Sequence, residues 1–198
     1  MSGPNRRRFL QSTAAATAAF AISGTKSSGN ILGANERLRV AVAGLHGRGR
    51  SHYGAYAKMK DVEVAYVVDP DSRQFARAIN DVKNISGTAP KPISDIREVL
   101  DDSELNIVSI ATPNHWHSLM SIWACQAGKD VYVEKPLSHN ISEGRKLVEA
   151  ARKYKRMVQH GTQQRSSSGR ASEIAALQSG KYGKLTVSKG YCCKPRWS

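Results

Sequence analysis

The sequence contains few cysteines, and these support neither a disulfide framework nor a metal site. Only three cysteines occur among the 198 residues, and two of them are adjacent. Cys192 and Cys193 would point to opposite faces of a strand, which disfavours an ordinary bridge between them. Cys125 lies in an apolar helical pattern and is expected to be a core residue. Because this spacing matches no metal-ligand motif, the sequence predicts no bound metal.

Acidic residues are also scarce, with 16 Asp and Glu against 30 Lys and Arg, giving a formal net charge of +14. Residues 143–198 hold thirteen basic residues and three acidic ones. Such a basic segment can bind nucleic acid or a membrane surface. No interleaved aromatic residues or nucleic-acid motif accompany it, which favours a solvated helix face. We therefore expect no nucleic-acid partner, and a basic polyanion-binding protein is the least favoured function.

The sequence has no long hydrophobic run, so no stable membrane anchor is expected. The mildly apolar residues 14–22 are too short and too rich in Ala and Thr for a membrane span. They follow a basic segment with a twin arginine, Arg6-Arg7-Arg8-Phe9-Leu10. This order is typical of a twin-arginine export signal, which predicts a periplasmic or extracytoplasmic protein. The alternative is a short basic tail on a cytoplasmic protein.

From Leu38 onward, short apolar runs alternate with segments of helical periodicity. The predicted strands are residues 39–43, 62–68, 92–93, 107–111, 130–133 and 157–161. The predicted helices are residues 50–59, 72–80, 96–101, 115–127, 142–154 and 168–179. Strands that are apolar on both faces and alternate with helices indicate a parallel sheet covered on both sides. The predicted fold class is therefore α/β, a doubly wound parallel sheet of the Rossmann type.

The last segment departs from this pattern. Residues 184–191 alternate with period two, which is typical of a half-buried antiparallel strand. No later segment remains to pair with it, so we interpret it as the start of a second α/β domain. The predicted domains are a signal and linker at 1–33, a dinucleotide-binding domain at 34–165, and the start of a truncated substrate domain at 166–198.

A glycine turn carries the first chemical signal. Gly44, His46 and Gly49 occupy the key positions of an approximate G-x-G-x-x-G motif between a strand and a helical run. In such motifs the first Gly makes the turn, the second admits a pyrophosphate, and the third allows close helix packing. His46 replaces the second Gly, so it is expected to adopt a positive φ, with Gly47 sharing this requirement. These residues and Arg48 are predicted to hold a dinucleotide.

Asp69 ends the next strand, 20 residues beyond Gly49. An acidic residue at this place binds the ribose hydroxyls of NAD and repels the 2′-phosphate of NADP. The alternative is a turn residue before Pro70. We therefore expect NAD as the cofactor, while NADP stays possible because Arg73 lies nearby.

Two further motifs follow strands whose carboxyl ends should meet the same edge of the sheet. Thr112, Pro113, Asn114 and His115 follow residues 107–111, and ligands of such sheets bind at that edge. They are predicted to contact the cofactor. His115 and His117 lie at i and i+2, so they do not share a helix face, and a metal site is disfavoured.

The most informative motif is Glu134-Lys135-Pro136, at the end of a later strand. Proline restricts the local backbone, and the parallel sheet aims this strand end at the ligand edge. Lysine can act as a general acid or base. Glu134 and Lys135 are therefore predicted to contact the cofactor, with Lys135 also catalytic. The alternative is a surface charge at a strand end.

Together these motifs resemble the Gfo/Idh/MocA oxidoreductases, relatives of glucose–fructose oxidoreductase and inositol dehydrogenase. The residues that carry the resemblance are 44–49, 69, 111–117, 127–137 and 161–165. The resemblance implies a cofactor domain followed by a larger α/β domain with an open sheet. It also implies that the intact enzyme is a homo-oligomer and transfers a hydride between nicotinamide and a sugar or cyclitol hydroxyl.

The resemblance assigns roles to two residues of the last motif. Lys135 would contact the reacting hydroxyl, and Pro136 would match a proline often found in cis. Many members also use a histidine in a D-x-x-x-H pattern of the second domain, and this sequence contains no such pattern. We therefore expect the 198-residue chain itself to be inactive. The alternative function is a non-catalytic nucleotide-binding module.

Overall fold

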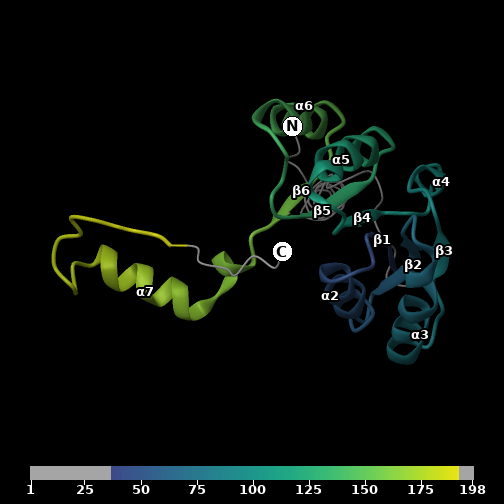
Figure 1. Cartoon of the computed structure of the whole chain (residues 1–198), viewed down its shortest axis with the longest axis horizontal. Helices are drawn as coiled ribbons and strands as arrows, with labels where there is room; N and C mark the ends of the chain where they lie inside the picture. Colours follow the sequence, from purple (N-terminus) through teal and green to yellow (C-terminus); the bar gives the residue numbers. More distant parts are fainter. Residues whose placement is uncertain (1–36, 192–198) are drawn as a thin grey trace, which may run out of the picture. The chain divides into compact units, whose positions relative to one another are not determined.

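The computed structural model describes residues 37–191, in which strands and helices alternate along the chain (Figure 1). The six strands are β1 (Leu38–Ala43), β2 (Val62–Val68), β3 (Lys91–Ile93), β4 (Ile107–Ile110), β5 (Asp130–Glu134) and β6 (Val158–Gly161). The α-helices are α2 (Arg48–Tyr56), α3 (Phe75–Ser86), α4 (Arg97–Leu100), α5 (His117–Gln126), α6 (Ile141–Lys153) and α7 (Ser168–Gln178). The chain divides into two compact units between His160 and Gly161, and each is described by itself.

The first unit is a doubly wound parallel sheet, as the sequence predicted. Its strand order is β3-β2-β1-β4-β5-β6, and all six strands are parallel. The central strand β1 pairs with β2 on one side and with β4 on the other. The direction of winding reverses between β1 and β4, and ligands of such sheets bind at the carboxyl ends of the strands at this point.

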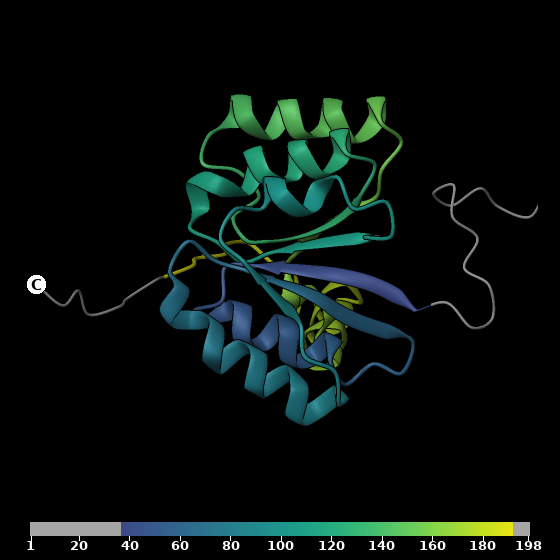
Figure 2. The ribbon, with the colours of Figure 1, turned by 90° about the vertical axis from the view of Figure 1, so that its right-hand side faces the viewer.

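Helices cover both faces of the sheet. Figure 2 shows α2 and α3 on one face and α4, α5 and α6 on the other. The run Val40-Ala41-Val42-Ala43 of β1 is fully buried, and its alternate residues enter the two separate cores. This explains why the strand is apolar at every position, since a strand covered on both faces has no solvent side.

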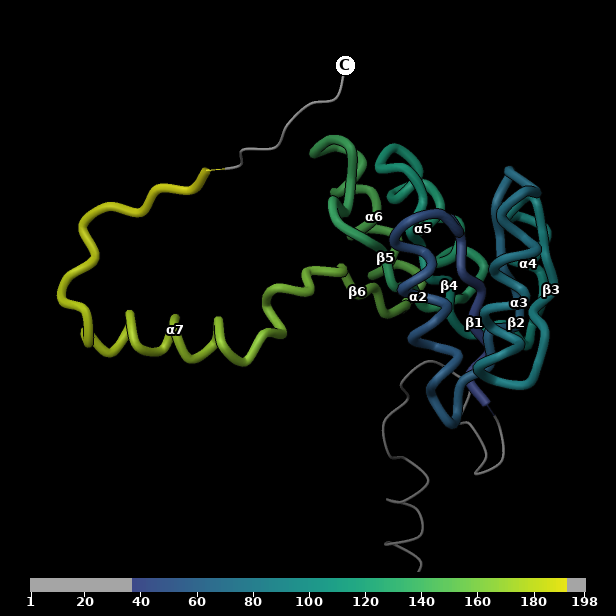
Figure 3. The backbone as a smooth tube through the Cα atoms, turned by 60° about the horizontal axis from the view of Figure 1, so that its bottom comes forward, coloured from purple at the N-terminus to yellow at the C-terminus, as the bar shows by residue number. Residues whose placement is uncertain are grey.

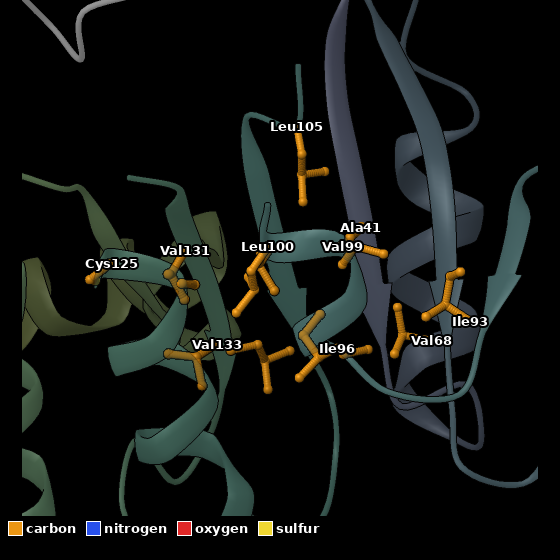
Figure 4. Packing of buried hydrophobic residues seen from close by; sticks show 14 of the residues in the cluster. Ala41, Val68, Ile93, Ile96, Val99, Leu100, Leu105, Cys125, Val131 and Val133 are labelled. Carbon is orange, nitrogen blue, oxygen red and sulfur yellow. The ribbon is translucent and has the colours of Figure 1, made fainter. Parts of the chain in front are cut away.

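The larger core lies between the sheet and helices α4 to α6. Figure 4 shows Leu100 of α4 on the side of Val131 and Val133 of β5, and Val99 beside Ala41 of β1. Cys125 of α5 belongs to the same cluster and is fully buried, which confirms the core position predicted for it. Burial raises the pKa of its thiol to about 11, so this cysteine is a poor nucleophile at neutral pH.

Two of the predicted helices open with a 3₁₀ turn instead of α-helix. The predicted helix at 72–80 begins as a 3₁₀ turn, Ser72–Gln74, and α3 then continues to Ser86. It extends because Val82 continues its buried face, and it ends where Gly87 adopts a left-handed conformation, with φ of 80°. The helix predicted at 115–127 likewise opens with a 3₁₀ turn, Asn114–Trp116, before α5.

The second unit departs most from prediction. Residues 184–191 form neither strand nor helix, so the predicted antiparallel strand is wrong (Figure 3). Leu185 and Val187 are about two-thirds exposed, at 64% and 66%. Period-two alternation supports a strand only where a neighbouring strand takes its backbone hydrogen bonds, and none of the described residues does so here. Helix α7 buries none of its residues.

Two predictions fall on parts of the chain outside the described residues. The export signal lies within residues 1–36, and Cys192 and Cys193 lie within residues 192–198. Among the described helices, none combines the length and the apolar character that a membrane crossing requires.

Candidate functional site

Gly44 and Gly49 let the polypeptide turn tightly at the end of β1. A Cβ atom on Gly44 would lie 2.6 Å from the backbone of Ala111 and Thr112, and Gly44 has a φ of +83°. A Cβ atom on Gly49 would lie 1.7 Å from the carbonyl oxygen of Gly44. No side chain fits at either position. The first turn of α2 therefore lies directly against the carboxyl ends of β1 and β4.

The backbone conformation of His46, in the middle of the turn, differs from the prediction. Gly47 adopts the positive φ, 47°, whereas His46 does not, because Lys155 alone among the described non-glycine residues has a positive φ. The glycine next to the motif position thus removes the steric cost that His46 would bear. His46, Gly47 and Arg48 are all exposed.

The N-terminus of α2 is open to an anion. Its N-cap residue is Gly47, which supplies no side-chain hydrogen bond, and no acidic residue occupies the first turn. Backbone N–H groups and the helix dipole attract phosphate at such a terminus. This arrangement fits the pyrophosphate of a dinucleotide, which could approach the backbone closely because of Gly44 and Gly49.

Asp69 connects the glycine turn to the loop after β2. One oxygen of its carboxylate accepts a hydrogen bond from the backbone amide of Leu45 at 2.8 Å. The other oxygen accepts one from the amide of Asp71 at 2.9 Å. These bonds hold the carboxylate at the carboxyl ends of β1 and β2, where the sequence placed it. Its binding to ribose stays a prediction.

A cavity of about 350 Å³ lies at this edge of the sheet. It is lined by Gly44, Val68, Pro70, Ser94, Asp95, Ile96, Arg97, Thr112, Pro113, Trp116, Met120 and Trp123. The rings of Trp116 and Trp123 lie 6.3 Å apart, and the guanidinium of Arg97 lies 6.0 Å from the ring of Trp123. Flat apolar and aromatic surfaces of this kind suit an aromatic base.

Thr112 supplies an unpaired polar atom in this cavity wall. Its hydroxyl oxygen is buried and has no hydrogen-bond partner in the described part of the chain. A buried hydroxyl without a partner costs free energy, so a bound hydroxyl or phosphate that pairs with it would be favoured. Together with the glycine turn, this atom shows that the edge is suited to a nucleotide.

Of the four predicted residues after β4, Thr112 and Pro113 line the cavity, whereas Asn114 and His115 do not. Pro113, Asn114 and His115 are exposed, and only Pro113 is among the residues that line the cavity. His117, for which the sequence disfavours a metal role, is buried between the two loops at this edge. Its Nδ1 lies 2.6 Å from the carbonyl oxygen of Pro136, and its Nε2 lies 2.8 Å from that of Thr112.

These histidines form no metal centre with other residues in the described part of the chain. Within residues 37–191, no three His, Cys, Asp or Glu side chains are grouped so that they could hold a metal ion. His117 instead connects the loop after β4 to the loop after β5.

Glu134, at the end of β5, is the most heavily bonded residue of the site. It is 3% exposed. One of its oxygens accepts hydrogen bonds from Arg48 at 3.0 and 3.1 Å and from His52 at 3.1 Å, and the other accepts one from the Lys135 amide at 3.2 Å. Burial alone would raise the pKa of this carboxyl, but the hydrogen bonds outweigh burial and hold the pKa below its usual range.

Lys135 is exposed at the same edge, and its bond to Pro136 is cis, as the resemblance implied. The structure therefore brings the glycine turn, Asp69, Thr112, Glu134 and Lys135 to one edge of one sheet. Several residues of the site carried no recognised signal in the sequence. They are Ile96, Met120 and Trp123 of the cavity, and His52 and Ser109 beneath Glu134.

Comparison with known proteins agrees with this geometry. The family description "Oxidoreductase family, NAD-binding Rossmann fold" of Gfo/Idh/MocA matches residues 38–162. The chain belongs to the Gfo/Idh/MocA oxidoreductase family. Its Rossmann domain is accordingly an NAD-binding domain.

The similar proteins differ in their names. Glycosyl hydrolase family 109 protein 1 of Shewanella sp. (strain MR-4) is 30% identical over 174 residues, which cover 76% of this chain and 38% of that protein. Alpha-N-acetylgalactosaminidase of Shewanella oneidensis is 28% identical, with the same shares covered. Scyllo-inositol dehydrogenase of Lactobacillus casei, solved with NAD(H) and scyllo-inositol, shares the fold with a TM-score of 0.66. It is 18% identical, over 75% of this chain and 43% of that one.

The chain thus spans 38% of the length of these curated relatives. The family model matches the cofactor domain, so the family membership refers to that domain.

Proposed function

We propose that this chain provides the NAD-binding part of an enzyme that transfers a hydride between nicotinamide and a hydroxyl-bearing carbon of a sugar or cyclitol. The observation that carries the proposal is the position of Lys135. It stands at the carboxyl end of β5, on the sheet edge that also holds the glycine turn and Thr112. A lysine at this edge can act on a substrate hydroxyl as well as contact the cofactor.

The described residues give NAD a place to bind along this edge. The cavity walled by Trp116, Trp123 and Ile96 would hold the adenine. The uncapped first turn of α2 would hold the pyrophosphate, and Asp69 the adjoining ribose. The remaining half of the dinucleotide would then extend past the glycine turn toward the ends of β4 and β5.

Lys135 would handle the proton of the reacting hydroxyl. Bound NAD supplies a two-electron acceptor for the hydride. When the substrate carbon gives up its hydride and its C–O bond becomes C=O, Lys135 would take the hydroxyl proton as general base. In the reverse direction the lysine returns that proton. His117, bonded to the carbonyl of Pro136, would keep the loop that carries the lysine in place.

The names of the relatives favour a second candidate, which is hydrolysis of a glycoside. NAD-dependent glycosidases are known as exceptions to the usual two-carboxylate mechanism. In such a reaction the substrate would be oxidised and then reduced again within each turnover, so no NADH would accumulate. The same cofactor site and the same lysine would serve both reactions.

Titration with NADH, followed by two assays, tests these proposals. The chain and the product of its full open reading frame are both assayed, because a separate substrate domain is part of the proposal. NADH formation from inositols or hexoses would support the oxidoreductase, whereas aglycone release from aryl N-acetylhexosaminides without net NADH would support the glycosidase. NADH binding with neither reaction would indicate a nucleotide-binding module, and absence of NADH binding would refute the proposed function.

We also propose that the protein is exported through its twin arginine. The support is the order of basic and apolar segments in the sequence. Fusion of residues 1–36 to a reporter that is active only after export tests this. Replacing Arg6 and Arg7 with Lys should abolish export, whereas an unchanged signal would contradict it.

A further inference from the structure

Three buried polar side chains form a row across one face of the sheet, outside the cavity. His52 of α2, Ser109 of β4 and Glu134 of β5 are 6%, 0% and 3% exposed. Their positions place them on the α2 side of β4 and β5. Buried polar groups are costly unless they are fully hydrogen-bonded. A row of this kind in an otherwise apolar sheet therefore calls for an explanation.

The hydrogen bonds of the row define the direction of each donor. Ring nitrogen Nδ1 of His52 lies 2.9 Å from the Ser109 hydroxyl, and Nε2 lies 3.1 Å from Glu134. An ionised carboxylate only accepts hydrogen bonds, so Nε2 donates to it. In a neutral imidazole, Nδ1 then accepts from the Ser109 hydroxyl. The ring of Tyr132 packs edge-on against His52, with centroids 5.3 Å apart, and restrains its orientation.

The row contains a serine, a histidine and a carboxylate, but it is not a hydrolytic triad. Ser109 is fully buried within β4, so no substrate can reach its hydroxyl. A nucleophile must be within contact distance of the reacting carbon. The role of the row must therefore lie in the residues outside it that Glu134 contacts.

Glu134 touches two elements of the site at once. It accepts hydrogen bonds from Arg48 in the first turn of α2, and from the backbone amide of Lys135. The row thus ties the phosphate-facing turn to the strand end that carries the lysine. None of its three members lines the cavity proposed for adenine. The cavity is lined by residues at the ends of β1 to β4 and by α5, whereas the row lies within α2, β4 and β5.

We propose that His52 is a positioning residue that, through Glu134, fixes the surface that receives the nicotinamide half of NAD. This inference rests on the proposed function, since it assumes a dinucleotide at this edge. His52 orients the Glu134 carboxylate through its hydrogen bond. The carboxylate in turn holds the Arg48 side chain and the backbone amide of Lys135. The adenosine half would be bound independently by the cavity.

The test compares NADH with ADP, which has the adenosine and both phosphates of NADH but lacks its nicotinamide riboside. Dissociation constants are measured for the wild-type chain, for His52→Ala and for His52→Gln. We expect His52→Ala to weaken NADH binding by about tenfold, the size expected for a lost hydrogen bond to a charged group. ADP binding should change by less than about twofold, because the cavity and the backbone N–H groups of α2 hold ADP, and ADP does not reach the Lys135 turn. His52→Gln retains an N–H donor and an oxygen acceptor, so it should restore most of the NADH affinity.

Tyr53→Phe is the matched control, because Tyr53 is the buried neighbour of His52 on the same helix. Its hydroxyl donates to Asp81 at 3.0 Å, away from the row. This variant should leave both NADH and ADP binding unchanged even where it lowers stability. If His52→Ala does not fold, Glu134→Gln preserves side-chain volume and should show the same selective loss of NADH.

Equal losses for NADH and ADP would overturn the inference and leave a purely structural row. Unchanged NADH binding in a folded His52→Ala protein would overturn it as well. A wild-type chain that binds neither ligand would instead refute the proposed function, which distinguishes the two failures.

Discussion

The position that a Cβ atom of Gly49 would take lies 1.7 Å from the carbonyl oxygen of Gly44. No pair of non-bonded atoms tolerates this distance, so α2 can begin against β1 only because residue 49 is glycine. The contact explains why the phosphate-facing end of the helix reaches the sheet edge. It also makes the glycine turn the part of the site most sensitive to substitution.

Gly49→Ala should destabilise the chain by about 1–3 kcal/mol or more, the range for overpacking in a tight contact. It should also abolish NADH binding. Gly54→Ala, in the same helix, is the matched control. A Cβ atom at Gly54 meets no atom within 4 Å, so it should raise stability by up to about 1 kcal/mol. Urea unfolding and NADH titration measure both variants. Equal behaviour of the two would show that the close contact does not govern the turn.

Trp116→Ala should weaken NADH and ADP binding alike, by about tenfold, because the tryptophan belongs to the proposed adenine cavity. This differs from the selective effect expected at His52. Trp116→Phe keeps an aromatic face and should retain most of the affinity. Isothermal titration with both ligands checks the prediction. Loss of NADH binding with ADP binding intact would place the adenine elsewhere.

Asp71→Asn should raise the affinity for NADPH relative to NADH by a few-fold, the scale set by exposed ion pairs. Asp71 holds Arg73 through two contacts, at 2.7 and 3.0 Å, and this arginine keeps the pKa of the carboxyl well below its usual range. The substitution would release the guanidinium for a 2′-phosphate. Adding Arg73→Ala should remove the gain. The wild-type chain should prefer NADH because of Asp69, and tighter NADPH binding would contradict that role.

Lys135→Ala, made in the product of the full open reading frame, should lower kcat and kcat/KM together. The expected loss is at least about 100-fold, the lower range for general acid–base catalysis. NADH affinity should stay within about twofold, because the glycine turn and the cavity hold the cofactor. Lys91→Ala is the control, because Lys91 lies in β3, the outermost strand at the far end of the strand order from β5 and β6. Turnover at the wild-type rate would exclude Lys135 as the acid or base.

Stability should depend on pH through His52. Burial lowers its pKa below the ordinary value of 6.5, despite the hydrogen bond to Glu134. Below about pH 6.5 the unfolded chain then binds a proton that the folded chain does not, so stability falls as the pH is lowered. For one proton the slope is at most about 1.4 kcal/mol per pH unit.

His52→Gln removes this titration. Urea unfolding at about pH 7.5 and pH 5.5 should therefore show a smaller loss of stability for the variant than for the wild type. Identical losses would mean that His52 takes up a proton as readily in the folded chain as in the unfolded one. The lowered pKa of Glu134 acts in the same direction, but at pH values below its ordinary 4.5.

The fold was largely predictable from local patterns. The run of β1 is apolar at every position because both of its faces are covered, and that pattern alone indicates a parallel sheet. Parallel strands place all their carboxyl ends at one edge, so the sequence also indicated that Gly49, Asp69, Thr112 and Lys135 would gather there. The predicted strand at 184–191 was wrong because alternation reports a half-buried face only when a partner strand exists.

The tertiary structure decided what those motifs touch. His52 and Ser109 have no motif of their own, and they become part of the site only because the side chain of His52 in α2 contacts Ser109 of β4 and Glu134 of β5. Trp116 and Trp123 become cavity walls because α5 packs near Ile96 and Arg97. The sequence by itself determined the sheet, its ligand edge and the class of cofactor, since these follow from periodicity and short-range glycine geometry. Contacts between residues far apart in the chain, such as Arg48 with Glu134, depend on the packing of whole elements, and only the folded structure shows them.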